Sequence, residues 1–167
     1  MSRGFVREDD QEEAPFIPPR AALPEGVPNH VTPRGLERLL AERSALETQR
    51  STVQGSDDER RREQAVIDGR LDLLNERIVT ARVVEKGKGV QEEVRFGSSV
   101  VFRYINGPQH GTERTFTLVG VDEASVAEQR IAFVAPVARA LIGKRIGEVA
   151  QFRLGTLDIR LEVVHIA

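Results

Sequence analysis

The sequence feature that most constrains the fold is a periodic series of apolar residues between positions 67 and 81. Its members follow alternating steps of four and three residues: Ile67, Leu71, Leu74, Ile78 and Ala81. On an α-helix this spacing places the side chains along one narrow stripe, as in a coiled coil. Such a stripe is buried against a second helix, so the pattern predicts one arm of a helical pair.

The segment before it predicts the other arm. Thr32 can cap a helix, and Pro33 suits the first turn because no N–H is needed there. The apolar positions of this arm are Leu36, Leu39, Leu40, Leu46 and Val53. Two further seam positions hold Arg43 and Arg50, which we expect to extend out of the seam or to pair with acids of the second arm, such as Asp68 or Asp72.

Together, residues 32–84 predict an antiparallel helical hairpin. With arms of about 22 residues it would project roughly 30–35 Å. A freestanding hairpin with so narrow a seam is only marginally stable and needs an anchor at its base.

The turn between the arms carries an acidic cluster, Asp57, Asp58 and Glu59. One interpretation is a shared magnesium ion, since Mg²⁺ takes one or two carboxylates and keeps positions open for water and phosphate. The other is structural, because Ser56 and Glu59 have the spacing of a capping box and acids in a first turn complement the helix dipole. Both remain open at this point.

Residues 94–167 have the alternation of β-strands and supply the anchor. The expected strands centre on residues 100–104, 116–120 and 131–133, with a final pair at 149–154 and 157–166. A short helix is expected from Pro136 to Ile142, closed by Gly143. The fold class is therefore α+β: an N-terminal helical hairpin followed by a β-rich domain with one short helix. Residues 85–93, which contain two glycines, are expected to be the linker.

Residues 1–31 are expected to be a disordered, solvated tail. They hold five of the eight prolines, Pro15, Pro18, Pro19, Pro24 and Pro28, and an early acidic group, Glu8, Asp9, Asp10, Glu12 and Glu13. The alternative is a docking segment whose apolar residues anchor on a partner or on the body of the protein. Those residues are Phe5, Val6, Phe16 and Ile17.

Composition excludes several classes of function. The chain has no cysteine, so thiol catalysis, disulfides and thiolate metal sites are excluded. His30, His110 and His165 lack ligand-like spacing, and we expect no metal site, no catalytic residue and no cofactor of the protein's own. A net charge of −2 argues against binding of duplex DNA as the main function of the protein. No apolar run is long enough to span a bilayer, and the N-terminus does not resemble a secretory signal, so we expect a cytoplasmic protein with no membrane contact. We also expect a monomer.

Four segments, in the same order along the chain, resemble the GreA/GreB family of transcript-cleavage factors. They are TPRGL at residues 32–36, FGSSV at 96–100, LVGVDEA at 118–124 and VAPVARALIGKRIGEV at 134–149. The resemblance implies a coiled-coil domain and an FKBP-like domain that docks at the secondary channel of bacterial RNA polymerase. It also implies docking contacts from Asp122 and Glu123 in a partly exposed strand-end turn, with Pro136 in the neighbouring loop on the same side.

The resemblance fails at the tip of the hairpin. Cleavage-active members of the family carry an acidic motif resembling D-L-S-E-N-A-E-Y, which holds the polymerase's second magnesium. That string is absent here, and the arms are shorter by roughly two turns each, or about 10 Å of reach. The catalytic role is therefore not transferred to Asp57, Asp58 or Glu59.

The resemblance thus predicts a factor that binds core RNA polymerase, regulates elongation, and meets nucleic acid only through the elongation complex. The departure at the tip favours a factor that occupies the channel without stimulating cleavage, and stimulated cleavage is the alternative. It is not expected to be an enzyme; at most it would stimulate the polymerase's own cleavage, sharing the polymerase's magnesium. One alternative is a regulator of another protein, similar to the regulators of nucleoside diphosphate kinase. A prolyl isomerase, the activity found on some FKBP-like folds, is disfavoured because the chain is only 5% aromatic.

Overall fold

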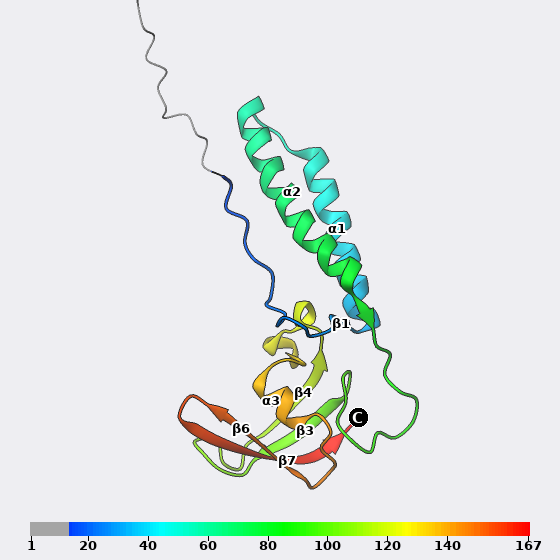
Figure 1. The fold of residues 1–167 in the computed structure, drawn as a ribbon, viewed down its shortest axis with the longest axis vertical. Helices are drawn as coiled ribbons and strands as arrows, with labels where there is room; N and C mark the ends of the chain where they lie inside the picture. Colours follow the sequence, from blue (N-terminus) through cyan, green and yellow to red (C-terminus); the bar gives the residue numbers. More distant parts are fainter. Residues whose placement is uncertain (1–13) are drawn as a thin grey trace, which may run out of the picture.

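Two long helices, α1 (Pro33–Thr52) and α2 (Asp57–Thr80), form an antiparallel hairpin that projects from a β-rich domain (Figure 1). The computed structural model describes residues 14–167. The helices contain 20 and 24 residues, which at 1.5 Å per residue gives arms of about 30 and 36 Å. The hairpin predicted from the heptad-like spacing is confirmed.

Each helix begins at the predicted cap. The Thr32 hydroxyl accepts a hydrogen bond from the Gly35 N–H at 2.9 Å. At the start of α2, the Ser56 hydroxyl accepts from the Glu59 N–H while the Glu59 carboxylate accepts from the Ser56 N–H, which completes a capping box. These contacts satisfy N–H groups that have no partner inside the helix.

The seam of the hairpin is buried along most of its predicted length. Its fully buried members are Leu39, Leu46, Ile67 and Leu74. Leu40 was also expected there, but its side chain is 37% exposed because its neighbour Leu39 takes the seam position. Arg50 pairs with Asp68 of α2, as predicted, whereas Arg43 pairs with Glu47 of its own helix.

A short parallel strand pair closes the base of the hairpin. Strand β1 (His30–Val31) lies beside β2 (Arg82–Val83), with the Arg82 N–H donating to the Asn29 carbonyl at 2.8 Å. The Asn29 side chain donates to the Arg77 carbonyl at 2.9 Å and so caps the C-terminal end of α2. Neither strand was predicted from the sequence, because each has only two residues.

The β-rich domain is a five-stranded, curled sheet with the order β5-β4-β3-β7-β6. Its strands are β3 (Ser99–Tyr104), β4 (Glu113–Val119), β5 (Arg130–Ala132), β6 (Val149–Leu154) and β7 (Leu157–Ile166). Only β4 and β5 are parallel; the other neighbours are antiparallel. The final strand pair has the predicted bounds.

One short helix, α3 (Pro136–Leu141), packs on this sheet (Figure 1). Ala138 and Leu141 on α3 and Phe102 on β3 are fully buried in one apolar core. Two short 3-10 helices, η1 (Val121–Glu123) and η2 (Val126–Glu128), connect β4 to β5. The predicted α+β class, a helical hairpin followed by a β-rich domain with one short α-helix, is confirmed.

An aromatic cluster joins the base of the hairpin to the β-rich domain. The His30 ring stacks on Phe133 with centroids 5.6 Å apart and meets the edge of Phe96 at 5.7 Å. The two phenylalanine rings contact each other edge to face at 5.5 Å. These contacts bury apolar surface between the two parts and fix β1 against the loop before β3.

Candidate docking surface

The predicted docking carboxylates, Asp122 and Glu123, both lie in η1, at the junction between the hairpin and the β-rich domain. Gly120 precedes them, and a Cβ at this position would lie 2.6 Å from the His30 carbonyl oxygen. The glycine therefore lets the backbone of β1 approach η1 closely. The Arg130 guanidinium donates to the Glu123 carbonyl at 3.0 Å and ties η1 to β5.

The Asp122 carboxylate is covered by two arginines from other parts of the chain. Arg20, in the N-terminal segment, donates from Nε to Oδ1 at 2.8 Å. Arg77, near the end of α2, places Nε 3.6 Å from Oδ2, which is too long for a hydrogen bond. Only 7% of the Asp122 side chain is exposed, and Oδ2 has no hydrogen-bond partner.

The same Arg20 guanidinium also clasps Glu42 of α1, with Nη1 2.9 Å from Oε1 and Nη2 3.0 Å from Oε2. This two-pronged geometry suits the planar guanidinium and is among the stronger forms of ion pair. Hydrogen bonding to Glu42 and the charges of both carboxylates raise the pKa of Arg20 above its ordinary value. Hydrogen bonds from Arg20 in turn lower the pKa of Glu42, with a further contribution from the charges of Arg20 and Arg70.

Glu123 turns toward the start of α1. Its Oε2 accepts a hydrogen bond from the Thr32 hydroxyl at 2.6 Å, so Thr32 caps the helix and contacts the β-rich domain at once. A Cβ at Gly35 would lie 2.7 Å from the same Oε2. Glu123 is therefore buried, with 5% of its surface exposed.

The expectation of a partly exposed polar turn is met only in part: Asp122 is half-buried as a residue but its carboxylate is covered, and Glu123 is buried. Each carboxylate is held inside the molecule, because the hairpin base and the N-terminal segment close over η1. Pro136 begins α3 and is exposed, and within residues 14–167 no hydrogen bond or ion pair links it to Asp122 or Glu123. The docking roles of all three residues remain predictions.

Each acid at the tip of the hairpin has a partner three residues away in the sequence. Asp57 pairs with Arg60 and Asp58 with Arg61, one helical turn further along. Glu59 belongs to the capping box, and hydrogen bonds from Ser56 lower its pKa below the ordinary value. The structural interpretation of the cluster accounts for all three side chains. Across residues 14–167, no group of three or more His, Asp or Glu side chains is arranged to hold a metal ion.

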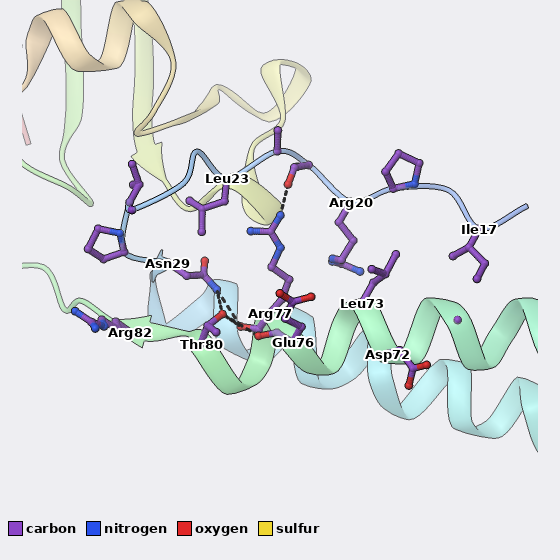
Figure 2. A pocket seen from close by; sticks show the side chains of 17 residues that line it. Ile17, Arg20, Leu23, Asn29, Asp72, Leu73, Glu76, Arg77, Thr80 and Arg82 are labelled. Atoms are coloured by element: carbon purple, nitrogen blue, oxygen red, sulfur yellow. Dashed lines mark hydrogen bonds between the residues drawn. The ribbon is translucent and has the colours of Figure 1, made fainter.

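The N-terminal segment contributes residues that sequence reasoning assigned to a solvated tail. Residues 14–31 lie along the hairpin and end in β1, and Ile17 contacts α2 at Gly69 (Figure 2). One signal was available: Arg20 is the only arginine or lysine between Arg7 and Arg34. Glu8, Asp9, Asp10, Glu12, Glu13, Phe5 and Val6 lie outside the described residues, whereas Phe16 is 80% exposed.

Comparison with known proteins identifies the class. A family model described as the C-terminal part of the GreA/GreB transcription elongation factors matches residues 89–167. GreA of Syntrophotalea carbinolica is 34% identical over 110 residues, which cover 66% of this chain and 68% of that protein. GreA of Thermodesulfovibrio yellowstonii is 34% identical over 107 residues, covering 64% and 66%. The aligned part thus spans about two thirds of each of these relatives.

The chain belongs to the GreA/GreB family of transcription elongation factors. Among solved structures, it is similar to Thermus aquaticus Gfh1, with 26% identity, a TM-score of 0.39, and coverage of 82% of this chain and 96% of that one. A GreA/GreB factor from Nitrosomonas europaea is 24% identical with a TM-score of 0.39, and the match covers 83% and 98%. No helix within residues 14–167 is both long and apolar enough to cross a membrane.

Proposed function

We propose that this protein binds bacterial RNA polymerase at the secondary channel, docks through its β-rich domain, and regulates elongation without stimulating transcript cleavage. Family membership supports the choice of partner. Asp122 and Glu123, beside the base of the hairpin, are the proposed docking carboxylates. The hairpin then points away from the docked domain, and its length sets how far it enters the channel.

The observation that carries the absence of cleavage is the state of the hairpin tip. A carboxylate that shares a catalytic magnesium ion needs free oxygen lone pairs aimed at the metal. Here Asp57 and Asp58 pair with arginines on the same helix, and Glu59 closes the capping box. Positive charge from Arg60 and Arg61 beside these acids also opposes binding of a second cation.

Transcript release from a backtracked elongation complex tests this proposal. We expect no stimulation by the wild-type protein, and the same baseline for a triple variant with Asp57→Ala, Asp58→Ala and Glu59→Ala. A GreA protein serves as the positive control. Stimulated cleavage by the wild type that disappears in the triple variant would overturn the proposal.

The docking assignment has its own test. The wild-type protein should capture core RNA polymerase, and the pair Asp122→Lys and Glu123→Lys should weaken that capture at least tenfold, because charge reversal at a docking site costs about 1.4 kcal/mol or more. The matched control reverses two exposed acids of the sheet, Glu113→Lys and Asp158→Lys. Thermal unfolding of both variants separates lost docking from lost folding. Capture of nucleoside diphosphate kinase in place of polymerase would contradict the proposal.

A further inference from the structure

The N-terminal segment, residues 14–29, follows α2 in the same direction toward the base of the hairpin; we term this segment the strap (Figure 2). Ile17 lies against Gly69, where a Cβ on the glycine would be 2.0 Å from Ile17 Cδ1. Further along, the Arg77 guanidinium donates to the Ala21 carbonyl. The strap then continues through Asn29 into β1.

Arg20 is the charged centre of the strap. Its guanidinium contacts Glu42 on α1 and Asp122 on η1, so one side chain of the strap spans the hairpin and the β-rich domain. Only 17% of the Arg20 side chain is exposed. As long as this contact holds, an external cation has no access to Asp122 Oδ1.

Open space nevertheless remains between the strap and α2. The strap and α2 line an open groove of about 980 Å³, and Figure 2 shows strap side chains on one side and α2 side chains on the other. Phe16 points into solvent, and Asp122 Oδ2 has no hydrogen bond although it is buried. A buried acceptor without a donor is unfavourable, so a partner that supplies a donor to this oxygen gains binding free energy when it replaces the strap.

We propose that the strap masks the docking carboxylate Asp122 and that the partner displaces Arg20 with a guanidinium or ammonium group of its own. This inference rests on the proposed function and adds a closed state to it. Docking then requires the open form, and the apparent affinity falls by the fraction of molecules that are open. If one molecule in ten is open, binding is about tenfold weaker than for the open form.

Arg20→Gln tests the proposal with the full chain. The variant keeps a polar side chain, but glutamine is shorter and uncharged and loses the ion pairs to Glu42 and Asp122, so the strap should open. We expect affinity for core RNA polymerase to rise by about three- to tenfold. The matched control is Arg114→Gln, which makes the same chemical change at an exposed position of β4. Affinity that is unchanged or lower in Arg20→Gln would overturn the proposal.

A disulfide between the strap and α2 tests the opposite change, in which the strap cannot open. The chain has no cysteine. A Cβ at Gly69 would lie 2.8 Å from Cγ1 and 3.5 Å from Cγ2 of Ile17, so a sulfur at a γ position of residue 17 would lie beside the β-carbon of residue 69. The double variant Ile17→Cys and Gly69→Cys should bind polymerase at least tenfold more weakly when oxidised, and recover on reduction. A thiol assay verifies the oxidised fraction, and each single cysteine variant serves as control.

The outcomes separate the two proposals. Equal binding by the oxidised, reduced and Arg20→Gln forms defeats the strap proposal and leaves the proposed function standing. Absence of polymerase binding in every form defeats the proposed function, and the strap proposal falls with it.

Discussion

The Thr32 hydroxyl donates a hydrogen bond to Glu123 Oε2 at 2.6 Å while it accepts one from the Gly35 N–H at 2.9 Å. One side chain thus caps α1 and attaches it to the β-rich domain. The direction in which the hairpin leaves the domain depends on this contact, together with the aromatic cluster around His30. The contact brings Glu123 close to the backbone at Gly35.

Gly35→Ala should weaken this attachment. In a helix interior, alanine is ordinarily about 1 kcal/mol more favourable than glycine. Here the new Cβ would lie 2.7 Å from Glu123 Oε2 and 3.3 Å from Thr32 Oγ1, so we expect net destabilisation of about 1–3 kcal/mol. Thermal unfolding measures the change.

A double variant shows whether Glu123 is the cause. Adding Glu123→Ala to Gly35→Ala removes the clash, so the two changes together should cost less than the sum of the single changes. Simple additivity would show that the loss at Gly35 has another origin.

Gly69→Ala should stabilise the hairpin, in contrast to Gly35→Ala. Position 69 lies inside α2, so alanine should stabilise the helix by about 1 kcal/mol. The new Cβ displaces the Ile17 side chain, which is flexible at its end. Hydrogen exchange should therefore show slower exchange in α2 and faster exchange in residues 14–22. Ile17→Ala with Gly69→Ala, which removes the clash, should restore the protection of the strap in part; a uniform response of helix and strap would contradict this account.

The elements that the sequence predicted well are those set by local periodicity. The spacing from Ile67 to Ala81 predicted α2, and alternation from residue 157 to residue 166 predicted β7. Pro136 and Gly143 bracket α3, as their conformational preferences require. In each case a single segment carries the whole signal, because the buried face repeats with the period of the element.

The contacts that the sequence did not reveal join distant segments. β1 and β2 have two residues each, too few for any periodic signal, and their pairing depends on closure of the hairpin. Arg20 contacts Asp122, which lies 102 positions further along the chain. The sequence around either residue has no pattern that indicates the other as its partner. Prolines correctly excluded regular structure from residues 14–28, but absence of helix and strand did not mean absence of contact, because backbone and side-chain groups of the strap find partners on α2 and η1.

Ser56→Ala tests the structural interpretation of the tip. The change removes the hydroxyl that accepts from the Glu59 N–H and donates to the Glu59 carboxylate. The first turn of α2 should fray, and amide exchange at residues 57–60 should become faster by several-fold, since loss of a cap frees N–H groups that no helical carbonyl can satisfy. Ser51→Ala, near the end of α1, is the matched control because its hydroxyl donates only to the Thr48 carbonyl. Equal exchange in both variants would remove the capping box as the explanation for Glu59.

Acid should open the strap through Glu42. The pKa of Glu42 is lowered, first by hydrogen bonds from Arg20 and then by the charges of Arg20 and Arg70, from an ordinary value of 4.5. The closed strap therefore favours the carboxylate form. The ionised Glu42 carboxylate stabilises the closed strap fully at pH values above 4.5. This stabilisation is lost as the pH falls through the lowered pKa of Glu42. Amide NMR signals of Ala21 and Ala22 should stay constant from pH 7 to about pH 5 and shift below that.

Glu42→Gln assigns the acid response to this carboxylate. Asp122, which pairs with both Arg20 and Arg77, remains in the variant, so the contact of Arg20 with η1 is retained. Because glutamine is neutral at every pH, the strap of the variant should already be looser at pH 7, and the step below pH 5 should shrink at Ala21 and Ala22. A step of the same size in both proteins would mean that Glu42 does not govern the strap at low pH. In that case the hold of Arg20 on α1 would contribute little to closure, and its contact with η1 would be the one that keeps the strap in place.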